Sequence, residues 1–183
     1  HVGVADASKK RLESAVALET ALIAALRETA PDLAKGASSV LHLRQLSHRL
    51  KSEGYAQALP ERIYRLLQGI ASDGRTSEQN AGSLQLRKID AEMVWVTLQR
   101  DWELLQKTAE LRKAAAQLLL THLLSRIPSD VRGYDCLAET TMGNLQTAVA
   151  SDLLLKNQIT ETTRLVECAL LWLHEQEVMR LGK

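Results

Sequence analysis

The sequence predicts a mainly α-helical fold that carries small β-hairpins. Apolar residues recur at helical spacing in several stretches, which segments rich in Pro, Gly and Ser separate. Between residues 84 and 98 this spacing gives way to alternation and to β-branched and aromatic residues. The 183 residues are enough for one large core or two small ones, and a hydrophobic content of 45% is that of an ordered protein.

Three helices are predicted in the first part of the chain, at residues 8–29, 38–53 and 60–72. Ser8 can cap the first helix, which lies in an N-terminal segment of residues 1–37, and Pro31 stops it. The second opens at Ser38 or Ser39. The third begins at Pro60, because proline suits the first turn of a helix.

A β-hairpin that turns near Asp90 is predicted for residues 84–98. Leu84 and Leu86 alternate with polar neighbours, and MVWVTL is typical of a strand, in which we expect Trp95 to face the core. A hairpin after a pair of helices is the order of a winged-helix module, whose helix pair and β-ribbon can enter DNA grooves. Residues 38–100 are therefore predicted to be a winged-helix-like module.

The rest of the chain is predicted to repeat this order after a long connecting helix in residues 101–128, which Pro128 closes. We expect a strand at CLAET (136–140), a short helix capped by Thr140 or Thr141, and a final helix capped by Thr160. VMRLGK (178–183) is then expected to be extended. Residues 129–183 would thus form a second winged-helix-like module that is truncated in its wing.

Charge distinguishes the two modules, although the formal net charge of the chain is only +1. Residues 38–90 carry eight lysines and arginines against five aspartates and glutamates, and residues 129–183 carry five against eight. Lys and Arg dominate the binding of DNA phosphates, so DNA contacts are expected in the mildly basic first module. The acidic second module is more typical of a structural or protein-docking unit.

The candidate DNA-binding residues are Arg62, Arg65, Arg75, Arg87, Lys88 and Tyr64. Arg62 and Arg65 are three residues apart and should share one helix surface, which could equally be an ordinary solvated face. Neighbouring strand residues point to opposite faces, so only one of Arg87 and Lys88 is expected to face a groove. Tyr64 could stack on a base, but a half-buried core position is the commoner role.

Motifs for catalysis, metal binding and membrane insertion are missing from the sequence. It contains no phosphate-binding loop, no dinucleotide fingerprint, no HExxH and no GxSxG. Cys136 and Cys168 are far apart and have no nearby ligands at zinc spacing. We find no signal peptide and no apolar run long enough for a membrane, so we expect a reduced, cytoplasmic compartment.

Several stretches resemble the region that follows the motor in large bacterial RecQ-type DNA helicases: ALPERIYRLLQGIASDG (58–74), the hairpin with RDWELLQKTAELRKAAAQLLLTHLL, SDVRGYDCLAETTMGNLQTAVASDLLL, and ALLWLHEQEVMRLGK. The likeness lies in their order and texture across roughly residues 38–183. It implies an accessory region of an ATP-dependent helicase in DNA repair, which would bind duplex or forked DNA beside the motor domains of the same parent chain. ATP and Mg would belong to that motor.

The sequence also departs from the better-known RecQ pattern. The four-cysteine zinc site of many members is absent, and no catalytic residue of the family can be carried over. The alternative function is a tandem winged-helix adaptor that binds proteins and has no direct DNA contact. The acidic second module and the small net charge favour that alternative.

Overall fold

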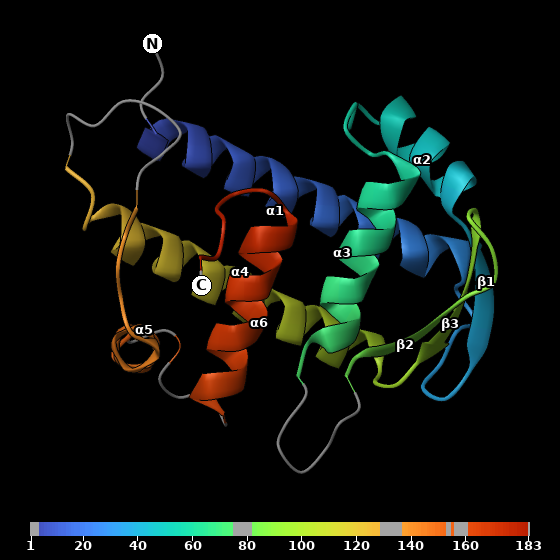
Figure 1. The fold of residues 1–183 in the computed structure, drawn as a ribbon. Helices are drawn as coiled ribbons and strands as arrows, with labels where there is room; N and C mark the ends of the chain where they lie inside the picture. Colours follow the sequence, from blue (N-terminus) through green and yellow to red (C-terminus); the bar gives the residue numbers. More distant parts are fainter. Residues whose placement is uncertain (1–3, 75–81, 129–136, 153–154, 156–160, 183) are drawn as a thin grey trace. The chain divides into compact units, whose positions relative to one another are not determined.

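The computed structural model describes residues 4–74, 82–128, 137–152, 155 and 161–182. Within them the chain is mainly helical and has one small antiparallel sheet (Figure 1), which confirms the predicted class. The elements are α1 (Val4–Thr29), β1 (Ser38–His42), α2 (Leu43–Ser52), α3 (Pro60–Ser72), β2 (Leu84–Lys88), β3 (Met93–Leu98), α4 (Trp102–Leu124), α5 (Met142–Ala150) and α6 (Thr162–Glu175).

The chain forms two compact units, whose borders fall inside α1 and α4. Val16–Ala109 is called the hairpin unit here, because it holds the whole sheet. His1–Ala15 together with Glu110–Lys183 is called the helical unit.

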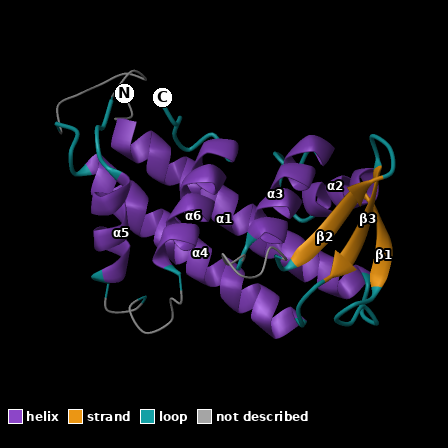
Figure 2. Cartoon of the chain, turned by 60° about the horizontal axis from the view of Figure 1, so that its bottom comes forward, coloured by secondary structure: helices purple, strands orange, loops and turns teal. Residues whose placement is uncertain are grey.

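The sheet of the hairpin unit has the order β1-β3-β2, so β3 is its central strand (Figure 2). Both pairings are antiparallel, and Val94 of β3 lies opposite Leu41 of β1 and Lys88 of β2. Alternation along β3 sends Val94, Val96 and Leu98 into the core, where each is at most 2% exposed. The hairpin and its turn near Asp90 are therefore as predicted.

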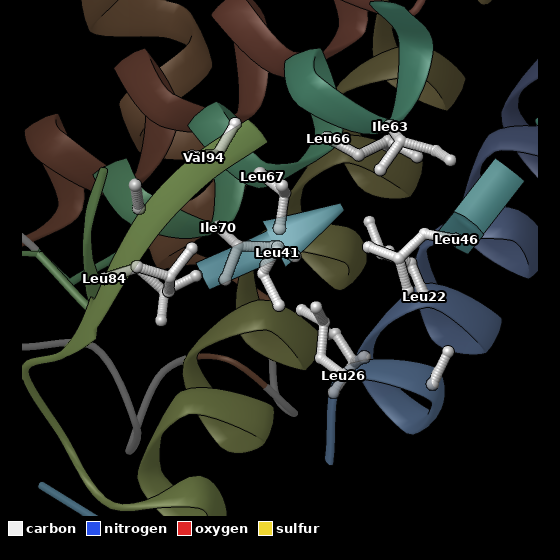
Figure 3. Close-up of a cluster of buried hydrophobic side chains, with 14 of the residues drawn as sticks. Leu22, Leu26, Leu41, Leu46, Ile63, Leu66, Leu67, Ile70, Leu84 and Val94 are labelled. Atoms are coloured by element: carbon white, nitrogen blue, oxygen red, sulfur yellow. The ribbon is translucent and has the colours of Figure 1, made fainter. Parts of the chain in front are cut away.

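One apolar core fills the space between this sheet and the helices of the unit (Figure 3). α3 supplies Ile63, Leu66, Leu67 and Ile70, none of which is exposed at all. Burying each such side chain contributes roughly 1.5–3 kcal/mol before the entropy cost of folding is counted. The same four side chains, three or four residues apart, fix which side of α3 faces inward and therefore which side is left for other contacts.

Two close contacts hold β2 against the end of α3. A Cβ built on Gly82 would lie only 1.6 Å from the carbonyl oxygen of Ala71, so no side chain fits there. The next residue, Ser83, donates its hydroxyl to the carbonyl of Asp73 at 3.3 Å. The hairpin is thus held next to the end of α3 by the two residues that precede β2.

The structure corrects two predicted helix starts in the hairpin unit. Residues 38–42 form β1 rather than the first turns of a helix, and α2 begins only at Leu43. The backbone groups of Ser38 to His42 pair with β3, a partner more than 50 residues away that helical spacing cannot reveal. The first helix begins at Val4, so Ser8 lies inside it and is not its cap.

The helical unit differs from the predicted second module in its strands. The described part of CLAET, residues 137–140, has no strand. Residues 178–182 also form no strand, because the chain after α6 closes the helix with a left-handed cap. Glu177 has φ 59°, its N–H donates to His174, and Val178 donates to Leu173, both at 3.0 Å.

The helices predicted for this unit agree better with the structure than its predicted strands do. α5 begins as expected at Thr141, whose hydroxyl accepts a hydrogen bond from the N–H of Asn144 at 3.2 Å. The predicted cap of the final helix, Thr160, lies outside the described residues, and α6 has Glu161 at the N-cap position.

Candidate nucleic-acid interface

α3 carries Arg62 and Arg65 on the side that is turned away from its buried leucines. Both side chains are partly exposed, and Glu61 and Gln68 beside them are exposed. Arg62 donates a hydrogen bond to Oε1 of Gln57 at 2.5 Å. No carboxylate of the described residues pairs with Arg65. The outer side of α3 therefore offers at least one guanidinium to an anionic ligand.

Lys88 and Tyr64 are brought together by the structure. The ammonium nitrogen of Lys88 on β2 lies 5.1 Å from the centre of the Tyr64 ring on α3. A cation–π contact of this kind contributes about 0.5–1 kcal/mol at an exposed site and ties the hairpin to the helix. Tyr64 is half-buried and packs against the core, which confirms its expected position and leaves less of the ring for stacking on a base.

Arg87 lies on the other face of the sheet. It stands directly opposite Trp95 in the register, and its guanidinium carbon is 5.8 Å from the centre of the Trp95 ring. The expectation that Arg87 and Lys88 point to opposite faces is confirmed. Arg75, the remaining candidate, lies outside the described residues.

The prediction that Trp95 faces the core is wrong. Its side chain is 37% exposed, because Val94 and Val96 on either side of it fill the core positions of β3. The alternation within MVWVTL was the available signal: if valine and leucine at 94, 96 and 98 face inward, Trp95 must face outward with Met93 and Thr97.

Other arginines of the hairpin unit are paired with acids. Arg44 lies 3.2 Å from Glu92, and Arg27 lies 2.9 Å from Glu103. Arg49 binds both Glu28 and Glu53, and these hydrogen bonds raise the pKa of its guanidinium above the ordinary value.

Arg65, Arg87 and Lys88 differ from these paired arginines. In the described parts of the chain, no aspartate or glutamate forms an ion pair with any of the three. Uncompensated positive charge therefore lies on α3 and β2, which are neighbours in the fold. Such charge is what the phosphates of a nucleic acid would neutralise.

The hairpin tip is built by Asp90. Its carboxylate accepts hydrogen bonds from the backbone N–H groups of Glu92 and Met93, both at 2.8 Å. Ile89 next to it is 48% exposed. Since its oxygen binds the backbone of the turn, Asp90 is part of the structure of the tip.

No metal-ligating cluster of three or more His, Cys, Asp or Glu side chains occurs within the described residues. Over the same residues, no helix is both long and apolar enough to cross a bilayer. Comparisons of the chain with protein-family profiles, with curated proteins and with solved structures found no match.

Proposed function

We propose that the chain is a DNA-binding and scaffolding accessory region of an ATP-dependent RecQ-like DNA helicase, and that its hairpin unit is a winged-helix module. In this proposal α2 and α3 are the helix-turn-helix pair and β2–β3 is the wing. The outer side of α3 and the hairpin bind duplex or forked DNA through its phosphates while the motor, elsewhere in the parent chain, moves along one strand.

The order of elements supports the winged-helix proposal. The hairpin unit runs helix, strand, helix, helix, strand, strand, and its first strand joins the hairpin in a single sheet of order β1-β3-β2. α2 and α3 pack on each other, and Ser47 of α2 donates its hydroxyl to the carbonyl of Ala58 at 2.6 Å just before α3 begins. In helix-turn-helix proteins the second helix of such a pair enters the major groove.

The observation that carries the DNA-binding proposal is the group of cations on α3 and β2. Arg65 and Lys88 have no acidic partner among the described residues, and Lys88 reaches α3 itself through Tyr64. Cations placed in this way can bind phosphates without first breaking an internal ion pair. Arg62, three residues and about one helical turn before Arg65, extends the same surface of α3.

The link to a helicase rests on the sequence resemblance. The described residues offer no catalytic constellation, and on this proposal ATP and Mg bind the motor domains, which are also the partner of this region. The segment 129–183 would serve as scaffold. A winged-helix assignment for that segment has less support, because its described parts contain only α5 and α6.

Binding to DNA across a salt series tests the proposal. The 183-residue chain is titrated into labelled fork, duplex and single-stranded DNA, and affinity is measured at several salt concentrations. We expect tight, salt-sensitive binding to the fork and duplex. Arg65→Glu should lower duplex affinity about tenfold for every sequence and reduce the salt slope by roughly one. The double variant with Arg62→Glu should lose more.

Lys107→Glu provides the matched control. Lys107 is an exposed residue of α4 within the hairpin unit, so its reversal changes the net charge as much as Arg65→Glu does. Equal losses in the two variants would mean that only overall charge matters and that α3 is not the binding surface. Absence of DNA binding even at low salt would reject the DNA-binding proposal.

A protein-binding adaptor is the second candidate, and exposed apolar residues of the helical unit favour it. Leu137 is 79% exposed, and Met142, Leu171 and Leu181 are each more than 40% exposed. Single exposed apolar residues are common on soluble proteins, but four in the acidic segment 129–183 suit a docking role. A chain that fails to bind fork, duplex and single-stranded DNA at low salt would point to this function.

A further inference from the structure

The sheet of the hairpin unit has a second face, on the side away from α2 and α3, that the proposed function does not use. Five of its outward residues are here called the open face: Val40, His42, Arg87, Met93 and Trp95. The helices α2 and α3 lie on the other side of the sheet (Figure 2). Trp95 stands at the centre of the open face, because it belongs to the central strand and pairs with Val40 and Arg87.

Aromatic exposure on the open face is unusual within this chain. Trp95 is 37% exposed, whereas the two other tryptophans, Trp102 and Trp172, are 8% and 1% exposed. The sequence has no phenylalanine, and its aromatic residues make up only 3% of the chain. A large, flat side chain is therefore left partly in water on the outward side of the central strand.

The charge of the open face has one sign. None of the outward positions of β1, β2 or β3 is an aspartate or a glutamate, and they include Arg87 and His42. The nearest hairpin acids are used elsewhere, since Glu92 pairs with Arg44 and Asp90 holds the turn. At the far end, Ser38 and Thr97 satisfy each other by a hydroxyl hydrogen bond of 2.7 Å. Gln85, the remaining polar outward residue, accepts a hydrogen bond from Gln99 at 3.1 Å, so the main polar groups left for a ligand are Arg87 and His42.

We infer that the open face binds single-stranded DNA, with a base stacked on Trp95 and a phosphate held by Arg87, and this inference rests on the proposed function. Single strands are bound by aromatic side chains next to a positively charged track, because each base has a free face for stacking. A duplex offers no free base face to Trp95, since its bases are already stacked on one another. An acidic side chain likewise has no flat apolar face to stack on the indole.

The guanidinium of Arg87 fits both parts of this role. Its guanidinium carbon lies 5.8 Å from the centre of the indole, near the outer limit of a cation–π contact. It can stay as a second stacking plane or turn outward to a phosphate. Duplex at α3 and single strand at the open face would then lie on opposite faces of the sheet, with the hairpin between them.

The test measures single-strand and duplex affinity separately. The full chain and its Trp95→Leu variant are titrated into labelled oligothymidylate and into labelled duplex. We expect Trp95→Leu to bind the single strand about tenfold more weakly, the loss of one stacked base, and to bind duplex as before. Trp95→Phe should recover most of the single-strand affinity. Oligothymidylate should also quench tryptophan emission, because the exposed indole is the one it covers.

Arg87→Gln keeps the inference testable if Trp95→Leu does not fold. This variant leaves Trp95 in place and should lower single-strand affinity several-fold and the salt slope by about one. Unchanged single-strand affinity in a folded Trp95→Leu or Arg87→Gln variant would overturn the inference, and so would an equal loss for duplex. Absence of single-strand binding by the unaltered chain would overturn it as well.

The two proposals fail in different ways. If Arg65→Glu lowers duplex affinity while Trp95→Leu leaves single-strand affinity unchanged, only the open face is rejected. If Trp95→Leu weakens single-strand binding and Arg65→Glu leaves duplex binding as it was, the open face stands and the role of α3 is rejected.

Discussion

The hairpin unit and the helical unit bury charged residues of opposite sign. The hairpin unit buries two acids, Glu19 and Asp73, which are 0% and 1% exposed. The helical unit buries two cations: Arg112 is 0% exposed and Lys113 is 2% exposed. Burial therefore removes negative charge from one surface and positive charge from the other. By sequence the hairpin unit carries 12 lysines and arginines against 11 acids and the helical unit 11 against 11, so burial, more than composition, sets the charges of the two surfaces apart.

The same comparison separates two uses of arginine. Arg112 lies under the ring of Trp172, 4.9 Å from its centre, and helps to fill the interior of the helical unit. Arg65 and Arg87 of the hairpin unit stay at the surface with no acidic partner in the described chain. A guanidinium is thus a packed, structural group in one unit and a surface group without an acidic partner in the other.

The largest effect is expected from Arg112→Ala. Truncation removes the packing of a fully buried side chain against Trp172 and leaves a cavity, so unfolding should become easier by about 2–5 kcal/mol. Urea unfolding followed by circular dichroism measures this free energy.

Arg164→Ala is the control for that prediction. Arg164 is an exposed arginine of the same unit and pairs with Glu167 at 3.1 Å. Loss of an exposed pair should cost about 0.5 kcal/mol or less. Comparable destabilisation by the two variants would break the distinction between structural and surface arginines.

A smaller loss is expected from Gly82→Ala in the hairpin unit. The added Cβ would meet the carbonyl oxygen of Ala71 at 1.6 Å, and a backbone atom cannot turn aside as a side chain can. The entry to β2 must shift, which should cost roughly 1–3 kcal/mol in thermal or urea unfolding. DNA affinity should fall too if the placement of β2 against α3 matters. A variant as stable as the unaltered chain would contradict this account of the contact.

The smallest effect, and of opposite sign, is expected from Gly143→Ala in the helical unit. A Cβ on Gly143 would meet nothing closer than the Thr141 hydroxyl at 3.9 Å, and the residue lies in the first turn of α5. Alanine loses less backbone entropy than glycine on folding, so the chain should gain about 0.5–1 kcal/mol. A higher melting temperature for Gly143→Ala beside a lower one for Gly82→Ala would sharpen the comparison between the units.

Local signals in the sequence were enough for most helices and for the hairpin. Pro60 marks the start of α3, Thr141 marks the start of α5, and the alternation around Leu84 and Val94 marks the two hairpin strands. Each of these signals comes from residues that are neighbours in the chain, as caps and periods are.

The errors arose where distant residues decide the structure. The apolar residues of β1 continue into α2 at Leu43, so the sequence alone suggests one helix. Pairing with β3, in which Leu41 lies opposite Val94, makes residues 38–42 a strand. For the candidate site, the opposite directions of Arg87 and Lys88 followed from strand geometry. The contact of Lys88 with Tyr64 could not be predicted from strand geometry, because it depends on how α3 packs beside β2.

The pairing of β1 with β3 has a consequence for the order of folding. β2 and β3 are joined by a short turn and can meet early, whereas Ser38 must find Thr97 across the helices between them. Closing that long loop is the slow step that contact order predicts for the hairpin unit. Until β1 arrives, one edge of β3 offers unpaired backbone groups to any other chain. Removal of β1 should therefore produce a unit that self-associates.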